Sequence, residues 1–197
     1  MFFAQPEPVP PPEVFEVFDQ PAGPMPAPPR RRQDGPRNVH VYGRRAALCF
    51  EADTTRQGVH TVAVDAAQAA GERRYDWGGK IRLQLTEAEL PQVACVLFGW
   101  LPRFEATAHG PAHDKGLSLE HQGVRIFVRV FARDAGVRAV PIEAPDIYRI
   151  GSLVLRQLRK NSPWLTGTDI LNLLRATVGR QAPVAGPVPA PQGHGGS

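Results

Sequence analysis

A segment with two alternating kinds of chemistry lies between Val124 and Phe131. Successive side chains of a β-strand point to opposite faces. One face of this segment would be aliphatic, with Val124, Ile126, Val128 and Val130, and the other would carry Arg125, Phe127, Arg129 and Phe131. Exposed rings are a costly apolar patch unless a flat group covers them, and guanidinium groups between them match the phosphates that flank a base. The pattern therefore indicates a surface that binds unpaired nucleotides.

Basic and aromatic residues also alternate in neighbouring predicted strands. One of these strands carries His40, Tyr42 and Arg44, with Arg45 next, and another carries Lys80, Arg82 and Gln84. We expect basic side chains to neutralise phosphates and rings to stack on bases, at about 1–3 kcal/mol per base. The predicted contact residues are Tyr42, Arg44, Arg45, Lys80, Arg82, Arg125, Phe127, Arg129 and Phe131. An alternative use of the arginine and phenylalanine face is to cover a second sheet or a subunit interface.

Single-stranded nucleic acid fits this predicted surface better than a duplex does. Stacking needs an unpaired base with a free π-face. Duplex recognition usually requires a helix or ribbon in the major groove, and no predicted helix has a basic leading edge rich in Asn and Arg. Trp77 is a further candidate for stacking, although a tryptophan at a strand end can equally fill a core.

Catalytic or metal-binding chemistry has one candidate cluster, formed by His109, His113, Asp114 and His121. Gly110 and Pro111 place the first two histidines at a turn, whereas a His-x3-His pair needs a helix to share a metal ion. The sequence has no Walker loop, dinucleotide fingerprint, HExxH motif or GxSxG motif. We therefore predict no enzyme activity, no metal and no cofactor.

Short strands have to position the predicted contact residues. Period-two alternation marks strands within 39–48, 59–65 and 80–85, and a second set within 103–108, 116–122, 124–132 and 137–142. Helices are predicted after Thr86, where Glu89 completes a capping box, and over 145–160 and 169–178. The order of four strands, helix, four strands and helix favours an α+β fold of antiparallel sheets with helices packed on one side.

Proline marks the two ends of the 197-residue chain as tails. Residues 1–36 hold 11 of the 21 prolines, 37–180 hold 6 and 181–197 hold 4. We expect a disordered acidic arm over 1–36, one nucleic-acid-binding domain over 37–180 and a disordered tail over 181–197. The arm has a net charge of −2 and the rest of the chain +6, which suggests a polyanionic ligand for the domain.

The remaining composition excludes several classes of protein. Cys49 and Cys95 are too few for a disulfide framework, and no apolar run is long enough to span a membrane. The first residues lack the basic and apolar regions of a secretion signal. We expect a cytoplasmic, nucleoid-associated protein without membrane contact, and 20 arginines against 3 lysines suggest a GC-rich bacterial genome.

Three blocks of the sequence resemble the Whirly single-stranded-DNA-binding proteins, fold relatives of the transcriptional coactivator positive cofactor four. Residues 41–48 are similar to the family's signature strand Tyr-Lys-Gly-Lys-Ala-Ala-Leu, with arginines in place of the lysines. Residues 69–90 resemble its block of Tyr-Asp-Trp, lysine, strand and helix start. Residues 104–116 are similar to its stretch that leads into a Lys-Gly loop.

The resemblance implies two four-stranded antiparallel sheets packed like propeller blades, with helices behind them. It also implies a homotetramer held by helical contacts, with single strands lying across the sheets between neighbouring subunits. With the surface above, it predicts a largely sequence-independent single-stranded-DNA-binding protein that coats or protects strands in replication, recombination, repair or DNA transfer. The alternatives are a transcription regulator or RNA-binding protein of the same fold, and a protein-interaction scaffold.

The arm contains an acidic and aromatic alternation at Glu13–Asp19. Such a segment imitates the charge and rings of nucleic acid. One hypothesis is that it folds back onto the basic sheet and competes with DNA, and another is that it recruits a protein partner. An inert spacer is the third interpretation.

Overall fold

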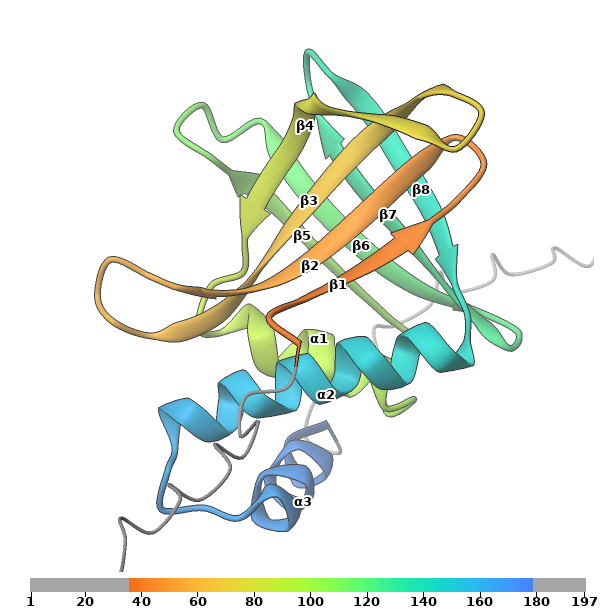
Figure 1. Cartoon of the computed structure of the whole chain (residues 1–197). Helices are drawn as coiled ribbons and strands as arrows, with labels where there is room; N and C mark the ends of the chain where they lie inside the picture. The colour runs from red at the N-terminus through yellow and green to blue at the C-terminus, as the bar shows by residue number, and fades with distance from the viewer. Residues whose placement is uncertain (1–35, 179–197) are drawn as a thin grey trace, which may run out of the picture. The chain divides into compact units, whose positions relative to one another are not determined.

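The computed structural model describes residues 36–178, which form two four-stranded antiparallel sheets and three helices (Figure 1). The first sheet contains, in order, β1 (Asn38–Tyr42), β2 (Ala46–Thr54), β3 (His60–Gly71) and β4 (Arg74–Gln84). The second contains, in order, β5 (Arg103–His109), β6 (Lys115–Gln122), β7 (Arg125–Ala132) and β8 (Gly136–Ile142). The helices are α1 (Glu89–Leu97), α2 (Ala144–Asn161) and α3 (Gly167–Val178). The predicted fold class is confirmed.

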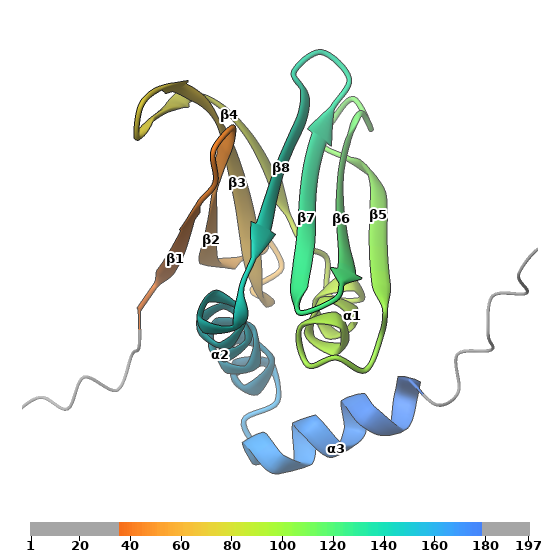
Figure 2. The same cartoon turned by 90° about the vertical axis from the view of Figure 1, so that its right-hand side faces the viewer.

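The two sheets share one apolar core. Alternation gives each strand one apolar face, and these faces pack against each other and against α1 and α2. The largest fully buried core side chains of the strands include Phe50, Leu48, Leu117, Leu119 and Ile126. In Figure 2 the sheets stand side by side above α1 and α2, and α3 lies beyond these helices. Because the inner faces meet, the outer faces of the two sheets point away from each other.

The helices begin where local sequence signals place them. The Thr86 backbone N–H donates to Glu89 Oε2 at 2.8 Å, and the Glu89 N–H donates back to Thr86 Oγ1 at 3.3 Å. This is the predicted capping box ahead of α1.

On α2 the apolar stripe is buried, and so is Gln157, whose Nε2 donates to the backbone oxygens of Asp53 (3.0 Å) and Thr61 (2.7 Å). Those two bonds attach α2 to the first sheet.

Two strand assignments made from the sequence are wrong. Val124 belongs to the two-residue turn between β6 and β7 and is 90 % exposed. The turn is made possible by Gly123, which has a φ of 65°, and β7 therefore starts at Arg125, one residue later than predicted. Arg44 is not part of the first strand either. The Gly43 N–H donates to the Ala46 oxygen at 2.9 Å, so the chain turns after Tyr42 and carries Arg44 and Arg45 in a loop.

The third and fourth strands extend further than predicted. They form a long hairpin across the 71–74 turn, with register shifts near Gln68 and Gly71. Tyr75 and Trp77 therefore lie in a strand. The segments 1–35 and 179–197, including Glu13–Asp19 and the predicted tail, lie outside the described residues.

Gly116→Ala tests the packing of the second sheet's outer face. A Cβ at Gly116 would lie 2.2 Å from Phe131 Cζ and 2.7 Å from the Ala106 oxygen, so the ring and backbone would have to move. We expect a loss of about 1–3 kcal/mol in the free energy of unfolding, measured by urea denaturation. Gly167→Ala is the matched control, since no heavy atom lies within 4 Å of its Cβ position. Equal stability of the two variants would contradict this packing.

Candidate nucleic-acid interface

The nine predicted contact residues are distributed over three places. The outer face of the first sheet carries Tyr42, Lys80 and Arg82, and the outer face of the second carries Arg125, Phe127, Arg129 and Phe131. Arg44 and Arg45 lie in the loop between β1 and β2. Since the two outer faces point in opposite directions, one chain does not bring all nine residues onto a single surface.

The outer face of β7 has the predicted alternation from Arg125 onward. Ile126, Val128 and Val130 are fully buried in the core, whereas the side chains between them lie on the outer face, where Phe127 and Phe131 are half-buried. Arg129 Nε donates to Ser118 Oγ at 3.0 Å, which holds the guanidinium against β6. The two rings therefore present part of their surface to solvent.

The rings of β7 have apolar or small neighbours on all sides but one. Phe131 pairs in register with Gly116 on one side and Val137 on the other, and its ring fills the space above Gly116. Phe127 pairs with Pro141 of β8 and with the exposed Glu120 of β6. These contacts hold the rings against the sheet and leave an apolar strip that runs toward β8.

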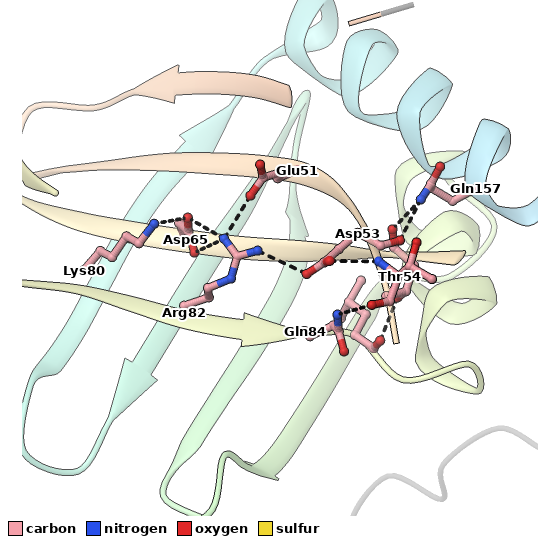
Figure 3. A network of polar contacts seen from close by, with 10 residues as sticks. Glu51, Asp53, Thr54, Asp65, Lys80, Arg82, Gln84 and Gln157 are labelled. Atoms are coloured by element: carbon pink, nitrogen blue, oxygen red, sulfur yellow. Dashed lines mark hydrogen bonds and ion pairs between the residues drawn. The ribbon is translucent and has the colours of Figure 1, made fainter. Parts of the chain in front are cut away.

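Lys80 and Arg82 sit in a network of ion pairs on the outer face of the first sheet (Figure 3). Arg82 contacts Glu51 (2.9 Å), Asp53 (3.1 Å) and Asp65 (2.9 Å), and Lys80 Nζ lies 2.7 Å from Asp65 Oδ2. The Asp65 side chain is 4 % exposed, so its charge requires these partners. Three carboxylates thus compensate two cations, and this part of the sheet is not a cationic surface.

Two members of the network, Asp53 and Arg82, have pKa values shifted in the directions that pairing requires. Burial opposes ionisation of Asp53, but hydrogen bonds from the Thr54 N–H, Gln84 and Arg82 outweigh it and lower the pKa. For Arg82, burial lowers the pKa and the carboxylates raise it by more. Cys49 lies in the same cross-strand row, where burial, followed by the charges of Asp65 and Glu51, raises the pKa of its thiol to about 11. The thiol is therefore protonated at neutral pH.

Four aromatic side chains gather at the other end of this face. The ring centroid of Tyr42 lies 5.9 Å from that of His40, in a stacked arrangement, and 5.5 Å from that of Tyr75. The ring of Trp77 contacts His40 edge-on, with a centroid distance of 5.4 Å. Tyr75 Oη donates to the Gly43 oxygen at 2.8 Å and so fixes the loop that carries Arg44. Tyr42 is 62 % exposed, which leaves much of its ring free.

Tyr42 lies between two pockets. One has a volume of about 580 Å³ and is lined by Tyr42, Arg73, Arg74, Tyr75 and Trp77. The other, of about 680 Å³, lies between the β1–β2 loop and β8 and is lined by residues 41–45, Ala139, Pro141, Glu143, Pro145 and Asp146. We call these two pockets, which share Tyr42, the Tyr42 groove. Because Pro141 lies beside Phe127, the groove leads from the first sheet's outer face to that of the second.

The arginines of the Tyr42 groove differ from Arg82 in having no carboxylate partner. The two acids that line the groove are engaged elsewhere, Glu143 with Arg125 at 3.0 Å and Asp146 with Arg149 at 3.3 Å. Within residues 36–178, no ion pair involves any of the groove's own four arginines, which are Arg44, Arg45, Arg73 and Arg74. Their charges are available to an anion.

Part of this groove is not predicted from the sequence. Tyr75, Arg73 and Arg74 are not among the predicted contacts, and Trp77 is predicted either to stack on a base or to fill a core. The alternation of Tyr75 and Trp77 was a usable signal, because it matches a strand with two rings on one face. It was obscured by the glycines at 78 and 79, which are typical of loops, although Asp76 Oδ1 accepts both of their N–H groups here.

The histidines considered for metal binding take part in separate contacts. His109 Nε2 lies 3.0 Å from Glu89 Oε1, His121 Nε2 lies 2.8 Å from the Val96 oxygen, and His113 Nδ1 lies 3.0 Å from the Ala108 oxygen. The described part of the chain has no group of three or more side chains arranged to hold a metal ion. None of its helices is both long and apolar enough to cross a membrane.

The resemblance to Whirly proteins extends to solved structures. No family model and no curated protein matches the sequence. The chain is similar to WHY3 from Arabidopsis thaliana, with 19 % identity over 71 % of this chain and 95 % of that one, at a TM-score of 0.46. It is similar to the plant transcriptional regulator PBF-2, with 18 % identity over 76 % and 89 % and a TM-score of 0.46. MRP1/MRP2 from Trypanosoma bruciei gives 13 % identity over 68 % and 91 %, with a TM-score of 0.49.

Arg82→Gln tests the ion-pair network. The variant leaves Glu51, Asp53 and Asp65 facing Lys80 alone, and we expect a loss of about 1–3 kcal/mol in stability, because one carboxylate is almost buried. The folded-state pKa of Asp53 is below its ordinary value of 3.8, so its contribution is present above that pH and is lost as the pH falls. Urea denaturation from about pH 7 down to pH 3 should show a smaller acid-induced loss in the variant.

Arg133→Gln supplies the control for this measurement. Arg133 is exposed in the turn after β7 and makes no ion pair with residues 36–178, yet the substitution removes the same charge. A loss of stability as large as that of Arg82→Gln would show that net charge, and not the network, causes the effect.

Proposed function

We propose that this protein binds single-stranded DNA, largely without sequence preference, through the Tyr42 groove and the outer face of β7. The observation that carries the proposal is the cluster of four aromatic rings beside four arginines that have no carboxylate partner in residues 36–178. Rings with a free face accept unpaired bases, and guanidinium groups bind the phosphates on either side.

The form of the surface favours single strands over duplexes. Both the Tyr42 groove and the strip on β7 are built on sheets, and within residues 36–178 no helix extends from them to enter a major groove. Stacking uses the faces of the bases, which a duplex hides. Ring faces and guanidinium groups do not distinguish the hydrogen-bonding edges of bases, so binding should tolerate most sequences.

The two outer faces support assembly into a homo-oligomer, with a tetramer as the favoured form. One strand that contacts the Tyr42 groove of one subunit and the β7 face of another would use both surfaces without wrapping around the core. At the base of the sheets, Tyr148 of α2, Trp164 in the turn between α2 and α3, and Leu173 of α3 are exposed, and Trp164 is 77 % exposed. We assign these apolar side chains to contacts between subunits.

The biological role proposed here is to coat or protect exposed strands during replication, recombination, repair or DNA transfer, in the cytoplasm and without catalysis or a cofactor. Lys80 and Arg82 then keep the first sheet in place and make few phosphate contacts, because carboxylates already pair with them. A gel shift that compares oligo-dT, an RNA of equal length and a duplex decides between DNA, RNA and no nucleic acid.

Tyr42→Ala should weaken binding of oligo-dT without changing its dependence on salt. The loss of one stacked base corresponds to about 1–3 kcal/mol, or roughly a 5- to 150-fold rise in Kd. Fluorescence anisotropy over a range of salt concentrations gives both values. Val124→Ala is the control, because it truncates an exposed apolar side chain in the turn before β7 that is not part of the Tyr42 groove. Unchanged affinity in Tyr42→Ala would rule out the groove as the binding site.

Arg44→Gln, Arg45→Gln and Arg129→Gln should each lower the salt dependence itself. Every phosphate contact to a single strand contributes about −0.7 to the slope of log K against log salt concentration, so each variant should reduce the slope by up to that amount. Arg82→Gln should leave the slope nearly unchanged, because carboxylates already compensate the charge of Arg82. A slope near zero in the wild type, or equal affinity for duplex and single strand, would contradict the proposed function.

A further inference from the structure

A third pocket lies at the opposite end of β1 from Tyr42. Its volume is about 300 Å³, and it lies between the start of β1, the β2–β3 hairpin and the second half of α2. Its lining residues are Arg37, Glu51, Ala52, Asp53, Thr54, His60, Arg156, Gln157 and Lys160. No predicted contact residue lines it, and it is separate from the Tyr42 groove.

The charges that line this pocket are not balanced within it. Its two carboxylates, Glu51 and Asp53, are paired with Arg82 at 2.9 and 3.1 Å, and Arg82 is not a lining residue. Its three cations, Arg37, Arg156 and Lys160, form no ion pair with any residue in 36–178. The pocket therefore holds three cations that do not pair with its own two carboxylates.

Two buried polar atoms in the lining residues have no hydrogen-bond partner. Across residues 36–178, four buried side-chain nitrogen or oxygen atoms are unpaired, and Arg156 Nε and Gln157 Oε1 are two of them. Arg156 Nη2 donates to the Pro36 oxygen at 2.7 Å, which fixes the guanidinium while its Nε–H remains unused. Flipping the Gln157 side-chain amide would not give Oε1 a partner, because Nε2 already donates to two backbone oxygens and the flip would break both bonds. Unpaired buried groups of this kind are unusual and call for an explanation.

We propose that this pocket binds a phosphate group. A phosphate oxygen would accept from Arg156 Nε, and the charges of Arg37 and Lys160 would neutralise the anion from two further sides. Gln157 Oε1 would accept from a hydroxyl of the same ligand or from water. Sugar phosphates carry both kinds of group, and a nucleotide is the phosphate compound most consistent with the unpaired donor and the unpaired acceptor together.

The phosphate could belong to the end of a strand, to the interior of a strand or to a free nucleotide, and the test separates these sources. Isothermal titration calorimetry of the full chain with thymidine 5′-monophosphate, inorganic phosphate and thymidine is carried out at constant ionic strength. We expect both phosphate compounds to bind and thymidine to give no heat of binding. Oligo-dT with a 5′-phosphate and with a 5′-hydroxyl is then compared by anisotropy.

Arg37→Gln and Arg156→Gln are the test variants, and each should weaken nucleotide binding by about tenfold or more, as expected for a lost charged hydrogen bond. Arg37 is exposed, so Arg37→Gln decides the question if Arg156→Gln fails to fold. Arg159→Gln is the matched control, because it removes the same charge from the same helix at an exposed position outside the pocket. The control should change the affinity by less than about twofold.

The oligonucleotides assign the source of the phosphate. A strand end is indicated if the 5′-phosphate strengthens binding and Arg37→Gln removes that gain. A strand interior is indicated if Arg37→Gln weakens both oligonucleotides equally, and a free nucleotide if it weakens neither. The proposal is overturned if neither phosphate compound binds, or if Arg37→Gln and Arg159→Gln have equal effects in every assay.

The same measurements keep this proposal separate from the proposed function. Nucleotide binding by a protein that does not bind oligo-dT would leave the pocket in place and refute single-strand binding. If oligo-dT binds in a way that depends on Tyr42, but no nucleotide binds and Arg37→Gln has no effect, single-strand binding is supported and the phosphate pocket is refuted.

Discussion

Both sheets bury one face in a single shared core, and this constraint determines what the rest of the protein can do. Every second side chain of a strand is buried in that core, as are Ile126, Val128 and Val130 of β7. The other half of the side chains is left on two faces that point in opposite directions. Polar and aromatic groups on those faces must therefore be paired among themselves, solvated or covered by a ligand.

On the outer face of the first sheet, some charged groups are paired with one another and others, a short distance away, are left unpaired. Around Arg82, acids and bases from β2, β3 and β4 compensate one another, and the nearly buried Asp65 makes that arrangement costly to disturb. At the β1 edge, arginines of the same chemical type have rings for neighbours and form no ion pair with a carboxylate of residues 36–178. Whether an arginine of this sheet is paired or left unpaired is therefore set by the neighbouring strands.

Features that depend on local periodicity could be predicted from the sequence, whereas features that depend on register could not. The alternation in β7 and the capping box of Thr86 and Glu89 involve residues a few positions apart. The pairing of Arg82 joins residues 17 to 31 positions apart, which meet only because His40, Cys49, Asp65 and Arg82 form one row across four strands. Periodicity indicated the order of four strands, helix, four strands and helix, and the resemblance to Whirly proteins implied that each set of four forms its own sheet. Neither predicted the paired state of Lys80 and Arg82.

The charge on the first sheet also limits the path that a single strand could follow in the proposed function. Three carboxylates around Arg82 outnumber the two cations that pair with them, so a phosphate backbone crossing the middle of the sheet would meet net negative charge. The Tyr42 groove and the pocket at Arg37 lie at the two ends of β1, about 16 Å apart at a rise of about 3.3 Å per residue. A strand that follows this edge reaches the unpaired cations of both sites and stays away from Asp65, and it meets Glu51 and Asp53 only where they line the pocket at Arg37. For the proposed function this favours a path along β1 over a path across the sheet.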